Sequence, residues 1–392
     1  MNTGSGKTVR NRAARSSNTN SSNKRIDAAS EKNRNTNQRA GNGNVHPWNA
    51  ANTPVFMATM LTGLEPIAAD EIQTKISDAQ IKETGRGKLF FASRQPVETL
   101  TALRSIDNLY IWIASFPIGP HKIHLHDLEK QMETIDLSKA VPESLTGRPV
   151  TFTVNSSRAG KHTYSRFDLS DAAARGLLKQ RPDWALGTPE DHMLEFRLDV
   201  QHEQAIFSCR LTSAEFRFRG ERLFSRAALR PTIAHALVWL SNPQPGDWFL
   251  DPFCGSGTIA AERAFYPYAQ IFGSDVSAEA VEAAKQNMPD LPGISIHQWD
   301  ARELPLDPGS IDTVVSNLPF GEQILTPEEI DDLYLRWIRQ LKRIVKPNGT
   351  AIVLTTKVEE LQIAADRFSL DCYELMGLSL KGLHPSICKL QF

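Results

Sequence analysis

Cysteine is scarce in this chain of 392 residues. The four cysteines, Cys209, Cys254, Cys372 and Cys388, are too few and too far apart for a disulfide framework or a paired zinc site. Long apolar stretches are missing as well: no run of 18 apolar residues exists, and the N-terminus lacks the hydrophobic core of a secretory signal. These absences exclude a disulfide-rich secreted module and membrane insertion. They predict a protein of the cytoplasm, where thiols stay reduced.

Large apolar side chains are nearly absent from residues 1–50, which are rich in Asn, Ser, Gly, Lys and Arg. Such a segment buries too little surface to offset the entropy of ordering, so a disordered basic tail is predicted. Residues 1–46 hold nine Lys or Arg against Asp27 and Glu31, a net charge of +7 that leaves −8 on the remainder, since the chain totals −1. The tail is either an electrostatic arm for nucleic-acid phosphates or a solvated segment without a role.

Residues 54–125 alternate between strand and helix patterns, which predicts a small α+β domain of the ferredoxin-like type. The expected elements are strands at 55–60, 88–92 and 109–114 and helices at 64–76 and 96–103. Three histidines, His121, His124 and His126, lie close together near the end of this segment. Because no cysteine or fourth ligand is nearby, a loop and helix start is favoured over a zinc or nickel site, and no metal is predicted.

Residues 126–212 contain a β-branched strand at 150–154 followed by a polar, basic turn at 155–162. A helix is expected from about Ser170 to Gln180, with Ser170 or Asp168 as its N-cap, and strands are expected at 193–200 and 204–211. Four side chains of the turn and helix start are candidates for contacting RNA phosphate or sugar: Arg158, Lys161, His162 and Arg166. Taken alone, the turn favours an ordinary solvated loop over an RNA contact.

A connector at residues 213–235 links the two halves. Between 216 and 230 it interleaves five arginines with three phenylalanines, a pattern that suits packing on one face and phosphate pairing on the other. Arg217, Arg219 and Arg222 are therefore further RNA-binding candidates, with structural pairing to carboxylates as the alternative. Pro231 begins the helix that leads into the last domain, residues 236–392.

A glycine loop at residues 251–258 joins the apolar run 248–250 to a helical run. Gly255 and Gly257 lack a Cβ, so the backbone there can take positive φ and let a ligand approach. Two later strands end in acids, Asp275 and Asp300, suited to ribose hydroxyls and to an adenine amino group. A fourth strand, at 311–315, runs directly into Asn317-Leu-Pro-Phe320.

The order of these motifs is more specific than any one of them. All lie at the carboxyl ends of predicted parallel strands, where such sheets bind ligands. A dinucleotide site would carry a third glycine where Ala260 stands, and a P-loop would carry Gly-Lys-Ser/Thr, which is absent. The pattern favours a site for a cofactor that contains adenosine.

Asp251-Pro-Phe-Cys-Gly-Ser-Gly-Thr258 together with Asn317-Leu-Pro-Phe-Gly321 resembles the class I S-adenosylmethionine-dependent methyltransferases that act on exocyclic amines of nucleobases. The strand, Arg-Ala-Gly-Lys-His turn and helix around 150–180 resemble a THUMP domain. The whole of residues 54–392 is similar to the THUMP-containing RNA guanine-N2-methyltransferases, nearest to those that act on the tRNA acceptor stem. The leucine at position 318 departs from the proline common in DNA amine methyltransferases and favours the RNA guanine group.

The resemblance implies an α/β fold in which a seven-stranded Rossmann-like methyltransferase sheet follows a ferredoxin-like and THUMP region. It implies that Asn317 and the Leu318 carbonyl accept hydrogen bonds from the target amine, with Pro319 in the same motif, and that Phe320 stacks on the base. The cofactor-binding residues that it implies are Asp251, Phe253, Gly255, Gly257, Thr258, Asp275, Val276, Asp300, Ala301 and Asn317.

The function expected from the sequence is therefore S-adenosylmethionine-dependent methylation of a tRNA guanosine at N2, most simply at position 6, by a monomer without a metal. A 23S rRNA guanine-N2-methyltransferase and a catalytically inactive THUMP RNA-binding protein are the alternatives, followed by a DNA adenine-N6 or protein glutamine methyltransferase.

Overall fold

A computed structural model describes Trp48 and residues 53–145, 147–219, 229–288, 291–319, 326–380 and 382–392. Residues of the predicted tail other than Trp48 lie outside the described part, as do Arg222 of the connector, Phe320 of the amine motif and Lys381. Residues 43–392 form one compact unit. No helix of the described part is long and apolar enough to cross a membrane.

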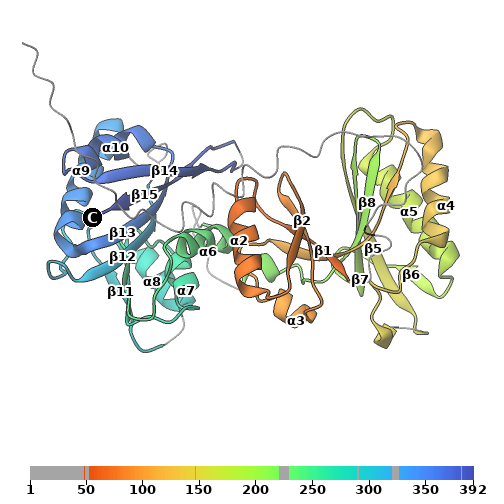
Figure 1. Cartoon of the computed structure of the whole chain (residues 1–392), viewed down its shortest axis with the longest axis horizontal. Helices are drawn as coiled ribbons and strands as arrows, with labels where there is room; N and C mark the ends of the chain where they lie inside the picture. Colours follow the sequence, from red (N-terminus) through yellow and green to blue (C-terminus); the bar gives the residue numbers. More distant parts are fainter. Residues whose placement is uncertain are drawn as a thin grey trace, which may run out of the picture. The chain divides into compact units, whose positions relative to one another are not determined.

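Both front segments contribute to one eight-stranded sheet with the order β2-β3-β1-β4-β8-β7-β5-β6 (Figure 1). Its strands are β1 Val55–Thr59, β2 Gln80–Gly85, β3 Lys88–Ala92, β4 Asn108–Pro117, β5 Val150–Ala159, β6 Trp184–Leu186, β7 Leu194–Gln201 and β8 Gln204–Arg210. Its helices are α2 Glu65–Lys75, α3 Val97–Leu100, α4 Leu125–Thr134 and α5 Arg166–Gln180. Antiparallel pairing of β4 with β8, from Tyr110↔Arg210 to Pro117↔Gln204, joins the ferredoxin-like segment to the segment predicted as THUMP.

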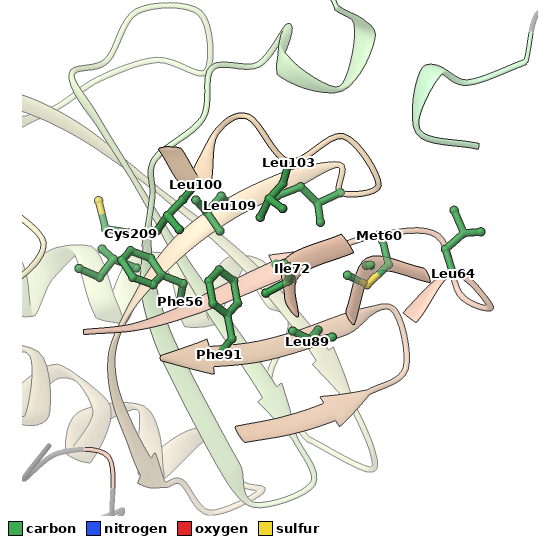
Figure 2. Packing of buried hydrophobic residues seen from close by; sticks show 14 of the residues in the cluster. Phe56, Met60, Leu64, Ile72, Leu89, Phe91, Leu100, Leu103, Leu109 and Cys209 are labelled. Atoms are coloured by element: carbon green, nitrogen blue, oxygen red, sulfur yellow. The ribbon is translucent and has the colours of Figure 1, made fainter. Parts of the chain in front are cut away.

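The front core forms where the apolar face of β1, β3 and β4 meets α2 and the 100–109 segment. Figure 2 shows Phe56, Phe91, Leu89, Ile72 and Leu109 in this cluster, and all are buried. The rings of Phe56 and Phe91 lie on adjacent strands with centroids 5.6 Å apart. On the other face of these strands Trp48 packs against Phe90 and Trp112, with ring centroids 5.2 and 5.6 Å apart.

Two expectations for the front half need correction, and a third is confirmed. Helix α5 begins at Arg166 rather than near Ser170, because Ser165 is the N-cap: its hydroxyl accepts from Asp168 N while the Asp168 side chain accepts from Ser165 N. Strands β2 and β6 were not expected, since β2 is largely exposed and β6 is only three residues long. The three histidines do lie at a helix start, as expected: a 3-10 turn, Lys122–His124, leads into α4.

The second sheet has seven strands with the order β11-β10-β9-β12-β13-β15-β14 (Figure 1), which confirms the expected methyltransferase fold. Its strands are β9 Trp248–Asp251, β10 Gln270–Asp275, β11 Ile294–Gln298, β12 Ile311–Asn317, β13 Val345–Thr355, β14 Asp371–Gly377 and β15 Ser386–Gln391. Its helices are α6 Pro231–Leu240, α7 Thr258–Arg263, α8 Ala278–Asn287, α9 Pro327–Ile344 and α10 Val358–Asp366. The first five strands are parallel, and β15 and β14 close the edge as an antiparallel hairpin.

Alternation along the strands gives this sheet two apolar faces. Phe249, Ile271 and Val315 pack with α6 and α7, whereas Leu250 and Val314 pack with α9 and α10. Because both faces are covered, the carboxyl ends of the parallel strands are where polar side chains can reach a ligand.

Candidate cofactor and amine site

The glycine loop follows β9 and precedes α7. Gly255 and Gly257 take φ values of +51° and +82°, which a side chain would strain. A Cβ on Gly257 would lie 3.2 Å from that of Ala284, whereas a Cβ on Gly255 would meet no atom within 4 Å and would enter the open space beside the loop. The loop is therefore closed towards α8 and open at Gly255. Thr258, the first residue of α7, is buried.

Asp251, the last residue of β9, is fully buried. Its Oδ1 accepts hydrogen bonds from Ser316 Oγ at 2.6 Å and from Phe253 N at 3.3 Å. Its Oδ2 is buried and has no partner in the described part of the chain. Burial raises the pKa of this carboxyl to about 7 against the opposing effect of the two hydrogen bonds, and the nearby Asp275 charge adds to the rise. When ionised, a buried carboxylate oxygen without a partner can accept a hydrogen bond from a cationic group of a ligand.

Asp275 ends β10 and lies directly against the glycine loop. Its Oδ2 accepts from Gly255 N and its Oδ1 from Ser277 N, both at 3.0 Å. Ser277 caps α8, because its hydroxyl accepts from Ala280 N. Val276, between these two residues, is 65% exposed, so an apolar surface lies next to the acid.

Asp300 follows β11 and is paired with Arg302, whose guanidinium donates to the carboxylate at 2.6 to 3.0 Å. This pairing holds the pKa of Asp300 below its ordinary value. Arg302 stands two residues after the acid and was not among the site residues expected from the sequence. Ala301, between them, is buried.

The amine motif begins at Asn317, the last residue of β12. Its side-chain Oδ1 is buried and has no partner in the described residues. The next residues are held from behind: Leu318 N donates to Leu354 O at 3.0 Å, and the Tyr334 hydroxyl donates to Pro319 O at 3.4 Å. The Tyr334 hydroxyl also lies 2.8 Å from Thr355 Oγ1. Tyr334 was not expected in the site, because a tyrosine on the apolar face of a helix is predicted to be an ordinary core residue.

Phe253 lies between the loop and α9, with its ring centroid 5.7 Å from that of Trp337. The site thus combines an open backbone at Gly255, an acid at the end of each of two strands, and two buried oxygens, on Asp251 and Asn317, that have no donor in the described residues. The ammonium of S-adenosylmethionine can donate to Asp251 and its ribose hydroxyls to Asp275, and an exposed valine can cover its adenine. These residues fit that cofactor.

A basic cluster lies at the end of β5 and the start of α5. Arg158, Lys161 and Arg166 are exposed there, while His162 is half-buried, stacked on Tyr164 and bonded to His202 O at 2.6 Å. The 120–124 segment joins them, since Lys122 N donates to Thr163 Oγ1 at 2.9 Å. Lys122 therefore belongs to this cluster, although the sequence alone did not point to it.

Among the residues described, no group of His, Cys, Asp or Glu could hold a metal ion.

The connector arginines divide into two kinds. Arg217 is exposed, with its guanidinium 4.6 Å from the ring centroid of Phe218. Arg219 points inward: it donates to Arg104 O at 2.6 Å and to Phe216 O at 2.8 Å, and its side chain is 8% exposed. Arg219 therefore has the structural role that was the alternative to RNA binding. It is not one of the RNA-binding residues that we propose.

Fold and site together define a class I S-adenosylmethionine-dependent methyltransferase domain. Residues 219–386 match the model of the RMKL-like methyltransferase domain family. Among curated proteins, the chain is 30% identical over 410 residues to human tRNA (guanine(6)-N(2))-methyltransferase THUMP3, covering 76% of this chain and 80% of that protein. The chain therefore belongs to the THUMP-containing guanine-N2-methyltransferase family.

Other relatives align over shorter lengths. The chain is 28% identical to the tRNA (guanine(6)-N2)-methyltransferase of Thermus thermophilus, over 53% of this chain and 62% of that one. It spans 43% of the Bos taurus THUMP3 protein at 30% identity. Among solved structures, TrmN from Thermus thermophilus shares the fold with a TM-score of 0.73 at 24% identity, over 86% of this chain and 99% of that one. The putative methyltransferase SMU.472, solved with S-adenosylhomocysteine, shares it with a TM-score of 0.69 at 19% identity.

Proposed function

We propose that this protein transfers a methyl group from S-adenosylmethionine to N2 of a guanosine in the tRNA acceptor stem, at position 6. The buried Oδ1 of Asn317, which lacks a donor in the described residues, carries this proposal, because it stands beside a cofactor loop and can accept a hydrogen bond from an exocyclic amine. The relatives named above are tRNA guanine(6)-N2 enzymes, which supports the choice of RNA and base.

We assign the cofactor to the loop and the strand ends. Asp251 Oδ2 would bind the ammonium, Asp275 the ribose hydroxyls, and Asp300 the adenine amino group, with Val276 and Ala301 beside the adenine. Gly255, Gly257, Thr258 and Phe253 would shape the methionine end. When bound, the cofactor's sulfonium supplies the methyl group, so no metal is needed.

Asn317 and the Leu318 carbonyl would orient the target amine. The guanine amino lone pair is delocalised into the ring, so the amine is a poor nucleophile, and holding it in line with the methyl group can lower the barrier by about 7–11 kcal/mol. Two acceptors directed at the amine hydrogens turn the lone pair towards the methyl group. The methylated amine would carry a surplus proton, which would leave to water, and Asn317 and the Leu318 carbonyl would keep their hydrogen bonds to the amine meanwhile.

The target base has to leave its stem before it can reach Asn317. Extruding it costs a few kcal/mol, and one aromatic stack returns about 1–3 kcal/mol. Phe320 is the proposed stacking residue. Its neighbours Leu318 and Pro319 are fixed to Leu354 and Tyr334, which supplies a rigid base for the motif.

The front half would hold the RNA. We assign residues 54–125 to the ferredoxin-like domain, 126–212 to the THUMP domain, 213–235 to the connector and 236–392 to the methyltransferase domain. Arg158, Lys161, His162, Arg166, Arg217 and Arg222 are the proposed RNA-binding residues, reading shape more than base sequence. We further propose a monomer that works in the cytoplasm.

The test is incubation of the full chain with labelled S-adenosylmethionine and either tRNA or rRNA from a strain that lacks the modification, followed by nucleoside analysis. Label in N2-methylguanosine of tRNA supports the proposal. Label in rRNA alone, in N6-methyladenosine, or in no nucleoside would contradict it.

A further inference from the structure

Ser316 stands between the two parts of the proposed site. It lies on β12 directly before Asn317, and its side chain is fully buried. Its Oγ lies 2.6 Å from Asp251 Oδ1. An ionised carboxylate can only accept, so the hydroxyl is the donor in this bond. One oxygen of Asp251 is thus occupied by Ser316, and the other is left for the cofactor.

This hydrogen bond joins two strand ends where backbone pairing has stopped. The ladder between β9 and β12 pairs Thr313 with Phe249 and Val314 with Leu250. On the other side of β12 the pairing with β13 continues through Ser316↔Val353 and Asn317↔Leu354. The amine motif is therefore held to β13 by backbone, and to the cofactor strand β9 by the Ser316 side chain.

Binding of a cationic ligand group to Asp251 should therefore restrict the position of Asn317 through this hydrogen bond. A cation at Oδ2 fixes the carboxylate plane, and a short charge-assisted hydrogen bond then fixes Ser316, whose backbone is continuous with Asn317. Without that cation, Oδ2 of the buried Asp251 carboxyl has no hydrogen bond, so the carboxyl is less firmly fixed in one orientation.

We propose that Ser316 is a positioning residue that couples the cofactor site to the amine motif, so that bound cofactor and bound RNA strengthen each other's binding. The inference rests on the proposed function. Coupling between two sites is reciprocal, so either ligand can report it. Ser316 touches neither ligand in this scheme and acts through Asp251 and Asn317.

The experiment measures the Kd of S-adenosylhomocysteine by titration calorimetry, in the presence and absence of saturating tRNA, on the full chain. This probe carries the same ammonium and carboxylate as the cofactor but cannot react. For the wild type we expect tRNA to tighten its binding about tenfold, within the usual range of site coupling. For Ser316→Ala we expect tRNA to tighten binding of the probe by less than about twofold. For Ser316→Thr, which keeps the hydroxyl, we expect the tightening of about tenfold seen in the wild type.

A matched control is Ser208→Ala. Ser208 is equally buried, on β8 of the front sheet, and its hydroxyl has no partner among the described residues. Removing its hydroxyl should leave the coupling factor unchanged. If Ser316→Ala lost its cooperative thermal transition, Ser316→Cys would take its place, because cysteine keeps the volume and donates only weakly.

A pH series separates coupling from a merely structural effect. The Ser316 hydrogen bond opposes the burial that raises the pKa of Asp251. Its loss should raise this pKa further and move the midpoint of S-adenosylhomocysteine binding to higher pH, with no such move in Ser208→Ala. Equal coupling in wild type and Ser316→Ala would overturn the inference while leaving the proposed function intact. Failure of the wild type to bind the probe would overturn both.

Discussion

Arg104, which is half-buried, and Glu262, which is fully buried, form a two-pronged ion pair. The guanidinium of Arg104, which follows α3, donates from Nε at 2.7 Å and from Nη2 at 2.9 Å to the carboxylate of Glu262 on α7. Glu262 is fully buried, and Arg219 Nε lies 3.8 Å from Glu262 Oε1, the oxygen that accepts from Arg104 Nη2. The pair ties the front half to the methyltransferase half within one compact unit.

Arg104→Ala should lower the free energy of unfolding by about 3 kcal/mol, because it leaves a buried carboxylate short of a partner. Urea denaturation measures the change. Arg175→Ala is the control: Arg175 also pairs with a glutamate, Glu129, but its side chain is 56% exposed, so the expected loss is below about 1 kcal/mol. Equal losses in the two variants would show that burial of the pair does not matter.

Asn317→Ala should abolish methyl transfer while S-adenosylhomocysteine and tRNA still bind. The variant removes the buried acceptor that would orient the amine and leaves the loop, the acids and the basic cluster intact. Single-turnover rates and two binding titrations check it. A parallel loss of turnover and of both affinities would mean that Asn317 supports the fold rather than the reaction.

Tyr334→Phe should slow the methyl-transfer step by about tenfold, the effect of about 1.4 kcal/mol on a barrier. Its hydroxyl holds Pro319 O and Thr355 Oγ1, so its removal loosens the motif without touching the cofactor loop. Tyr373→Phe is the matched control, since Tyr373 is 50% exposed on β14. We expect kcat to fall only in Tyr334→Phe, with the Kd of S-adenosylhomocysteine unchanged in both.

Asp251 predicts opposite pH dependences for stability and for cofactor binding. Burial raises its pKa from 3.8 to about 7 in the folded protein, so between these values the folded chain holds a proton that the unfolded chain releases. The free energy of unfolding should therefore fall as pH rises from about 4 to 7, by at most about 4 kcal/mol, and then level off. The ionised carboxylate binds the ammonium, so affinity for S-adenosylhomocysteine should rise over the same window.

Asp251→Asn checks both dependences. It should remove this part of the pH dependence, make the ligand-free protein more stable than wild type at pH 8, and abolish binding of S-adenosylhomocysteine. Urea unfolding at pH 5 and pH 8 with matching titrations provides the measurement. A variant less stable than wild type at pH 8 would contradict this account of Asp251.

The basic cluster of the front half predicts a salt effect. Replacing Arg158, Lys161 and Arg166 together by Gln should weaken tRNA binding and reduce the slope of log affinity against log salt by about 2, at about 0.7–0.9 per lost phosphate contact. A control of equal charge replaces exposed Lys82, Arg94 and Arg367 by Gln. Equal slopes in the two triple variants would remove the cluster from the RNA interface.

The sequence was sufficient where function follows from position along a strand. Asp251, Asp275 and Asn317 each end a parallel strand, and the carboxyl ends of such strands share one edge of the sheet. The seven-stranded sheet, by contrast, was implied by the family resemblance, and the structure confirms it. The predicted start of α5 was wrong because three nearby polar residues can each serve as N-cap in the sequence. Only the structure shows that Ser165 is the N-cap.

What the sequence could not give depends on packing between distant residues. The bond from Ser316 to Asp251 spans 65 positions, and that from Arg104 to Glu262 spans 158. Neither pair forms a pattern with a period or a motif, and a buried arginine looks like an exposed one until its partner is known. The pairing of β4 with β8, which merges two predicted domains into one sheet, is likewise a long-range choice.

The most direct measurement of the central claim is the nucleoside made by the full chain from labelled S-adenosylmethionine and unmodified tRNA, with its position mapped on the RNA. The account predicts N2-methylguanosine at position 6 from the wild type and none from Asn317→Ala. Labelled N6-methyladenosine, or N2-methylguanosine formed equally by wild type and Asn317→Ala, would contradict it.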